Sequence, residues 1–248
     1  DPATKLCLVE VAEPDMHAPT GDLERLAEAL RDQWGLQAPE IDLPTLARLQ
    51  TVLRKGGWQA TVAVHHGRPG RPPKLVQLWP GFFEGPLLGL AVDVGSTTVA
   101  AHLCDLTTGA VTASAGVMNP QIRFGEDLMS RVSYAMMNPG GAAEMTAAVR
   151  AAIDRLARDL AAEAGAAPEQ IVEAVFVCNP VMHHLLLGID PVELGQAPFA
   201  LAAQGALHLE ARDLGLAALA PGRRGLRPAL HRRAMWAPTP PRSRSPNG

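Results

Sequence analysis

Cysteine and aromatic residues are scarce in this 248-residue sequence, and its net charge is small. Its three cysteines, Cys7, Cys104 and Cys178, form no C-x-x-C pair, so neither a disulfide framework nor an iron–sulfur cluster is expected within the chain. The formal net charge is −3, which gives no reason to expect nucleic acid or an anionic membrane as a partner. These features fit a protein of the reducing cytoplasm best.

Long apolar runs and the common nucleotide-binding loops are missing as well. No run approaches the ~20 residues that span a bilayer, and the charged first residues do not form a signal peptide. Neither G-x-x-x-x-G-K-[ST] nor G-x-G-x-x-G occurs, so a bound nucleotide would need a different loop. Apolar residues nevertheless make up 47% of the chain, enough for one large domain or two small ones.

A short polar turn joins two apolar, strand-like stretches near the middle of the chain. Gly95 can adopt a positive φ and has no Cβ, so the backbone there can approach a ligand closely. Ser96, Thr97 and Thr98 add hydroxyl and N–H groups suited to phosphate oxygens. Asp93, at the end of the first stretch, is placed to hold a hydrated divalent cation. On these residues alone, a phosphate site and a plain tight hairpin remain equally open.

The first third of the chain predicts a small α+β unit that shows no chemistry of its own. Apolar residues alternate in three strand-like segments and recur at helical spacing in two others. His65 and His66 lead into a stretch rich in Gly, Pro and Arg, and adjacent residues on a strand face opposite sides. We therefore expect both histidines in a solvated loop. The predicted strands are residues 5–11, 58–64 and 74–79, and the predicted helices are residues 22–31 and 43–53.

Beyond the turn, the pattern predicts an antiparallel three-stranded meander, two helices, another strand and a last helix. Asn119, Pro120 and Gln121 are loop residues that either contact a ligand or cap the next helix. Asn179 ends the later strand, where it is placed for a ligand, although an Asn that only caps a helix would look the same. The predicted strands are residues 90–94, 99–103, 110–116 and 171–178, the last parallel to the first, and the predicted helices are residues 126–137, 141–164 and 181–187.

This order of elements, with Asp-Val-Gly-Ser-Thr-Thr in the first turn, resembles the ribonuclease-H-like lobe of the actin, sugar-kinase and heat-shock-chaperone ATPase superfamily. Two of its segments, Asn-Pro-Gln at residues 119–121 and His-His-Leu-Leu-Leu-Gly at residues 183–188, make it much more similar, within that superfamily, to the reductive activators of corrinoid proteins. The resemblance implies an α/β fold in which an α+β N-terminal unit precedes an actin-like ATPase lobe with a mixed sheet, the second lobe being missing. The segments that carry it are residues 89–100, 119–121 (Asn-Pro-Gln), 125–131 (Gly-Glu-Asp-Leu-Met-Ser-Arg), 179–191 (Asn-Pro-Val-Met-His-His-Leu-Leu-Leu-Gly-Ile-Asp-Pro) and 211–215 (Ala-Arg-Asp-Leu-Gly).

The resemblance also implies an activity and its cofactors. Members of this family use ATP hydrolysis to drive the one-electron reduction of cob(II)alamin to cob(I)alamin on a corrinoid protein or cobalamin-dependent methyltransferase. Electrons enter through an N-terminal domain with a 2Fe-2S cluster, which this sequence lacks together with its cysteines. Mg-ATP is the implied cofactor, with Asp93 holding Mg²⁺ through water. The residues that match the phosphate segments are Asp93, Gly95, Ser96, Thr97, Thr98 and Asn179.

The tail departs from the family pattern. We expect a linker and middle α+β domain at residues 1–86, a partial ATPase lobe at 87–222 and a disordered tail at 223–248. One coding of a family-like His-Val-Gly-Ala-Asp-Thr adenosine segment, shifted by one base, spells residues 235–248, so we interpret the tail as frameshifted. A natural disordered basic tail is the alternative. Without that segment no residues would pack against the adenine ring, so we expect little or no ATP affinity for this chain.

Two other functions remain open at this point. A sugar-kinase-like phosphotransferase would need a catalytic Asp and a second lobe, and the sequence offers neither. A non-catalytic module could instead dock on a corrinoid protein or form a homodimer without turnover.

Overall fold

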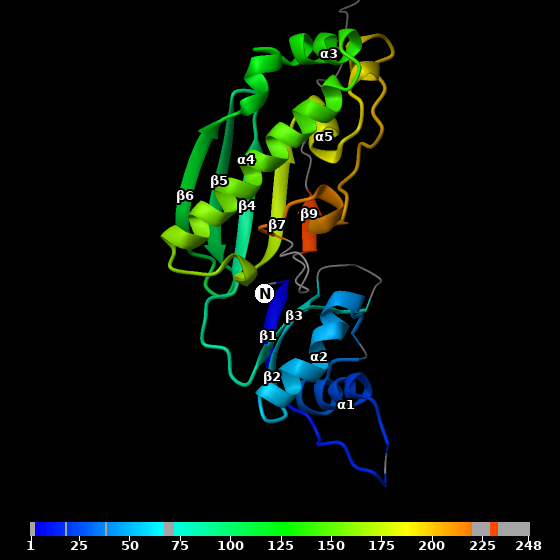
Figure 1. The fold of residues 1–248 in the computed structure, drawn as a ribbon, viewed down its shortest axis with the longest axis vertical. Coiled ribbons are helices and arrows are strands. Elements are labelled where there is room, and N and C mark those ends of the chain that lie inside the picture. The colour runs from blue at the N-terminus through cyan, green and yellow to red at the C-terminus, as the bar shows by residue number, and fades with distance from the viewer. Residues whose placement is uncertain (1–2, 18, 38, 67–71, 220–228, 233–248) are drawn as a thin grey trace, which may run out of the picture.

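The computed structural model describes residues 3–17, 19–37, 39–66, 72–219 and 229–232, the last four by their backbone only. These residues form two β-sheets with their helices, one above the other in Figure 1. Within this part of the chain, no helix is both long enough and apolar enough to cross a membrane. Most of the predicted tail, residues 223–228 and 233–248, lies outside the described residues.

The smaller unit is an antiparallel three-stranded sheet in the order β1-β2-β3, with two helices against it (Figure 1). Leu26 and Leu30 from the first helix and Leu49 and Leu53 from the second are buried against the sheet, as their helical spacing predicts. The second helix begins at a cap, where the carboxylate of Asp42 accepts a hydrogen bond from the Thr45 N–H. The elements are β1 (Thr4–Glu10), α1 (Asp22–Trp34), α2 (Leu43–Lys55), β2 (Gln59–His65) and β3 (Lys74–Pro80).

The larger unit is a six-stranded mixed sheet in the order β6-β5-β4-β7-β9-β8. The meander β4-β5-β6 is antiparallel, whereas β7 runs parallel to β4, which confirms both predictions. The backbone of Ala229–Arg232, within the expected tail, forms β9 beside β7. The strands are β4 (Leu88–Val94), β5 (Thr98–Asp105), β6 (Val111–Met118), β7 (Ile171–Cys178), β8 (Leu209–Glu210) and β9 (Ala229–Arg232).

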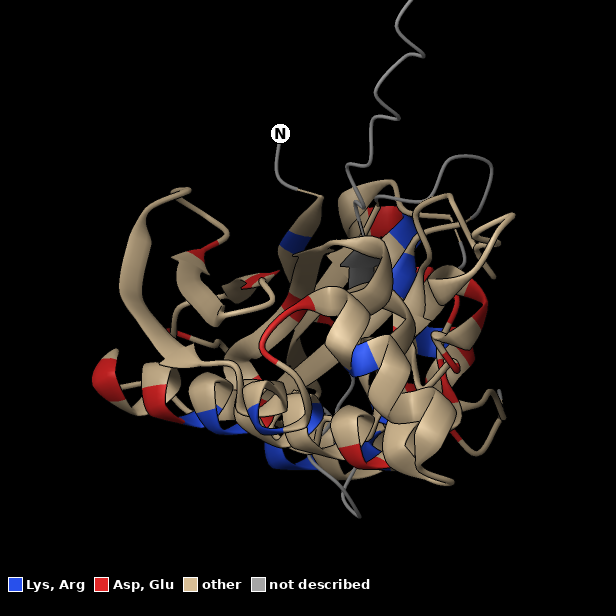
Figure 2. Cartoon of the chain, turned by 90° about the horizontal axis from the view of Figure 1, so that it is seen from above, with Lys and Arg blue, Asp and Glu red and all other residues tan. Residues whose placement is uncertain are grey.

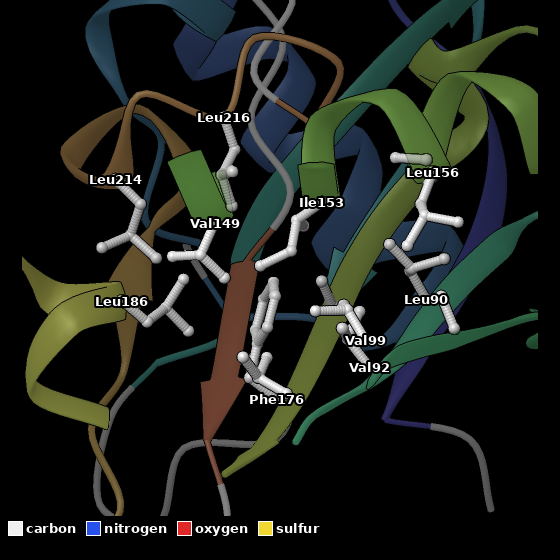
Figure 3. Close-up of a cluster of buried hydrophobic side chains, with 14 of the residues drawn as sticks. Leu90, Val92, Val99, Val149, Ile153, Leu156, Phe176, Leu186, Leu214 and Leu216 are labelled. Atoms are coloured by element: carbon white, nitrogen blue, oxygen red, sulfur yellow. The ribbon is translucent and has the colours of Figure 1, made fainter. Parts of the chain in front are cut away.

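One face of this sheet is covered by the long helix α4 (Gly141–Glu163). Figure 3 shows Val149 and Ile153 above Phe176 at the centre of the resulting core. Leu90 and Val92 of β4 point into the same core, and the alternation along the strand turns Ala91 and Asp93 to the other, exposed face. The remaining helical elements are η1 (Pro120–Phe124), α3 (Leu128–Met137), η2 (Pro168–Gln170), α5 (Pro180–Leu187), η3 (Val192–Gly195) and η4 (Ala211–Leu214).

Polar and apolar contacts join the two units. Ala63, Val76, Leu87 and Val172 form a buried cluster between the sheets. Beside it, the Thr4 hydroxyl donates to Glu173 Oε2 at 3.1 Å and lies 2.9 Å from His65 Nδ1. His65 is therefore buried at the end of β2, so its predicted place in a solvated loop is wrong.

A second polar link is the ion pair between Lys74 of β3 and Glu210 of β8. Both side chains are largely buried, with 9% and 15% of their surfaces exposed. Elsewhere on the ribbon, acidic and basic residues are interspersed, as Figure 2 shows for the described chain.

Candidate functional site

The polar turn and Asn179 lie side by side because β4 and β7 are parallel neighbours. Val94 pairs with Cys178 in the register, so the residues that follow each strand leave the sheet at the same edge. This edge is the upper end of the sheet in Figure 1, next to α3 and α5. The structure thus brings together two segments that are more than eighty positions apart in the sequence, which open α/β sheets commonly do at ligand sites.

Glycine at position 95 is required by close packing within the turn. The Gly95 N–H donates to Thr98 O at 3.0 Å, and a Cβ on Gly95 would lie 2.8 Å from that same oxygen. Gly95 is not among the residues with a positive φ, so the turn does not use the freedom of glycine to adopt one. A close backbone approach, here to Thr98, explains the glycine instead.

The groups expected to meet a ligand face outward from this turn. Asp93 is exposed on the face of the sheet opposite α4, Thr97 and Thr98 are exposed, and Ser96 is half-buried. Within the described residues, the N–H groups of Ser96 and Thr97 meet no hydrogen-bond acceptor. Two free N–H groups beside hydroxyls and one exposed carboxylate form a set that suits an anion carrying a hydrated cation.

Asn179 acts as a helix cap in this structure. Its Oδ1 accepts a hydrogen bond from the Met182 N–H at 2.9 Å, and Pro180 occupies the first turn of α5. The capping role that the sequence left open is therefore present. Asn179 remains half-buried at the sheet edge beside the turn.

Two side chains hold the turn from its buried side: Asn119, for which the sequence left a ligand contact or a helix cap open, and Arg131, which was not singled out as a site residue. Asn119 Nδ2 donates to Gly95 O at 2.8 Å, and Arg131 Nη2 donates to Ser96 O at 2.5 Å. Both residues are completely buried. Asn119 caps η1, so Pro120 and Gln121 lie in a short 3₁₀ helix and not in an irregular loop, whereas Asn119 precedes that helix.

Of the three cysteines, Cys178 lies at this edge of the sheet, as the last residue of β7. Cys7, Cys104 and Cys178 lie on three different strands and are not joined by disulfides, and burial raises the pKa of Cys7 to about 11 despite the opposing effect of Lys5. No group of three or more His, Cys, Asp or Glu side chains in the described ranges is arranged to hold a metal ion. The cysteines therefore do not fit an iron–sulfur cluster.

Comparison with known proteins gives a consistent result over almost the whole chain. Residues 88–230 match the family model described as the RACo middle region, and residues 1–85 match the RACo linker region. A curated relative, "Corrinoid activation enzyme RamQ" of Eubacterium limosum, is 32% identical over 133 residues, which is 54% of this chain and 22% of RamQ.

A solved structure titled "Reductive activator for corrinoid,iron-sulfur protein" superposes with a TM-score of 0.75 at 30% identity. The match covers 95% of this chain and 36% of that protein. The fold is therefore that of a reductive activator, with an actin-like lobe as predicted. The chain spans well under half of the length of either relative.

Proposed function

Because this chain belongs to the RACo family, we propose that it is part of an ATP-dependent activator that returns the cob(II)alamin of a corrinoid protein to cob(I)alamin. In this proposal, residues 1–86 are the linker unit and residues 87–222 form the first ATPase lobe. A cobalamin-dependent methyltransferase is an equally suitable partner. A cytoplasmic location belongs to the same proposal, since cysteines that form no disulfide suit a reducing compartment.

The observation that carries the proposal is the geometry of the turn after β4. Two consecutive N–H groups, at Ser96 and Thr97, are without acceptors among the described residues, and Asp93 is exposed next to them. Phosphate oxygens would accept from these N–H groups and from the hydroxyls of Thr97 and Thr98. Asp93 would hold Mg²⁺ through its water ligands, and Asn179 would border the phosphates from the end of β7.

Mg-ATP, when bound, supplies the free energy for an otherwise unfavourable reduction. The turn contributes binding and orientation of the phosphates. Nucleotide can shift the conformation of the partner only by the difference in its affinity for two states of the activator. The electron would come from a 2Fe-2S cluster in another domain of the whole protein, because the cysteines of this chain do not fit one.

Titration of the ¹⁵N-labelled chain with Mg-triphosphate and with Mg-ATP tests the phosphate site. We expect similar, weak dissociation constants for both, on the order of 1 mM, because the adenosine segment expected from the family does not occur in this sequence. The amide signals of residues 95–98 should move most, and Asp93→Asn should weaken binding. Unchanged amide signals at the turn in saturating Mg-triphosphate would contradict the proposal.

A chimera tests the role in the whole protein. This chain would replace the matching segment of RamQ, and ATP-dependent formation of cob(I)alamin would be followed by its absorption spectrum on the RamQ corrinoid partner. Activity that disappears with Asp93→Asn is expected. Turnover stimulated by a glucose-type substrate would favour a sugar kinase instead, and partner binding that ignores nucleotide would favour a docking module.

A further inference from the structure

The carbonyl groups of the turn are all held from the side opposite the open edge of the sheet. Gly95 O accepts from Asn119 Nδ2 at 2.8 Å, and Ser96 O accepts from Arg131 Nη2 at 2.5 Å. Thr97 O accepts from the Asn119 N–H at 2.8 Å. Three consecutive carbonyl directions are thus fixed by two residues that are themselves fully buried.

Because of the geometry of the peptide bond, these contacts also determine the direction in which the free N–H groups point. In a planar trans peptide, the C=O of one residue and the N–H of the next point in opposite directions. Fixing Gly95 O toward Asn119 therefore turns the Ser96 N–H away from Asn119. Fixing Ser96 O toward Arg131 turns the Thr97 N–H away from Arg131. These are the two N–H groups that meet no acceptor within the described residues.

The two holding side chains are anchored in turn by rigid elements. Asn119 Oδ1 accepts from the Gln121 N–H at 2.9 Å, and Gln121 Nε2 donates to Met145 O of α4 at 2.9 Å. Arg131 Nε donates to Gly125 O at 2.9 Å, which joins α3 to the end of η1. The position of the turn is consequently set by η1, α3 and α4 together.

Arg131 also places a buried positive charge beneath the turn. Its guanidinium is 0% exposed, and in the described part of the chain it contacts carbonyls, an amide oxygen and a thioether sulfur but forms no ion pair. Burial lowers the pKa of Arg131, while Asp127 at the exposed start of α3 acts in the opposite direction. A buried cation that lacks a contacting anion is costly, and a phosphate group at the turn would compensate part of that cost.

We propose that Asn119 and Arg131 are positioning residues that aim the Ser96 and Thr97 N–H groups at the phosphates of the bound nucleotide. This inference rests on the proposed function, because it concerns the same phosphate site. Asn119 supplies direction only, whereas Arg131 supplies direction and charge. Neither side chain touches the ligand, since both are enclosed behind the turn.

The test uses the 248-residue chain, with Mg-triphosphate as the probe and the Ser96 and Thr97 amide signals as the readout. Arg131→Met should weaken binding about tenfold, because a hydrogen bond from a charged group is lost together with the charge. Arg131→Lys should have an intermediate effect, since an ammonium group cannot replace a planar guanidinium that donates to two carbonyls. Asn119→Asp, which replaces the donor by an acceptor facing Gly95 O, should also weaken binding.

Arg123→Met is the matched control. Arg123 is an exposed arginine on η1 whose guanidinium lies over the Phe124 ring at 4.6 Å, so the variant removes one positive charge without changing a contact of the turn. Binding by this control should stay within about twofold of the wild-type value, as for an exposed charge. Urea unfolding of every variant separates loss of global stability from loss of the turn geometry.

The outcomes separate the inference from the proposed function. In the folded Asn119→Asp and Arg131→Lys variants, positioning predicts lower ¹⁵N order parameters at Ser96 and Thr97 together with weaker binding. A purely structural role would lower the unfolding free energy and leave both readouts unchanged, which would overturn the inference alone. If the wild-type amides do not respond to Mg-triphosphate, the proposed function and the inference fall together.

Discussion

The ion pair between Lys74 and Glu210 offers a measurable test of how the two units are joined. Lys74→Met removes the ammonium group from β3 and leaves the Glu210 carboxylate of β8 in a site where only 15% of its side chain is exposed. Breaking a fully buried pair costs about 3–5 kcal/mol, so we expect about 2–3 kcal/mol for this partly exposed one. The double variant Lys74→Met/Glu210→Leu should return to within about 1 kcal/mol of wild type, because neither charge of this pair remains.

Urea unfolding followed by circular dichroism and tryptophan fluorescence measures these differences. Arg31→Met is the control, because the side chains of its pair with Asp32 are 51% and 60% exposed, so this pair should contribute little to stability. If Lys74→Met cost no more than this control, the junction between the units would be hydrated. The description of the Lys74 and Glu210 side chains as largely buried would then be wrong.

Three further predictions each concern one residue, namely Glu173, Gly95 and Phe176. Burial raises the pKa of Glu173 above its ordinary value of 4.5, against the hydrogen bond from Thr4. A group whose pKa is higher in the folded state stabilises the fold at pH values below its ordinary pKa. This contribution is lost as the pH rises through the folded-state pKa. Glu173→Gln should therefore be more stable than wild type at pH 8 and similar near pH 4 in urea unfolding, whereas an equal difference at both pH values would contradict this. Gly95→Ala should cost about 1–3 kcal/mol in thermal unfolding, because its Cβ would press on Thr98 O, and an unchanged Tm would refute that contact. Phe176→Ala should lower the free energy of unfolding in urea by about 3–5 kcal/mol and Phe176→Leu by much less, since the ring is 0% exposed and the larger truncation leaves the larger cavity. Similar losses in the two variants would contradict this.

Elements with a strong local pattern could be predicted well from the sequence. The largely apolar run at β7 (Ile171–Cys178), interrupted by Glu173, was predicted with the observed bounds, because few alternatives bury such a run. The helical spacing before Gly165 likewise predicted α4 to within a residue at its end. The polar turn was located correctly, since it interrupts two apolar strands at one point.

Features that depend on distant partners could not be predicted. His65 is buried because Thr4, 61 positions earlier, lies beside its ring, and no local pattern carries that pairing. Arg131 is buried because carbonyl oxygens at Gly125 and Ser96 surround its guanidinium, although arginine is usually exposed. Asn119 belongs to the same case, because its partner Gly95 O is 24 positions away. The ligand role of the turn stays a prediction until binding is measured.

β4 connects the two ends of the larger unit in one straight element. Its first residue, Leu88, directly follows Leu87 of the buried cluster between the sheets, and its last residue, Val94, leads into the turn. The seven residues of the strand span roughly 20 Å. A hydrogen-bonded central strand is stiff along its length because neighbours hold it on both sides. The turn and the contact with the smaller unit are therefore the two ends of one continuous, centrally placed strand.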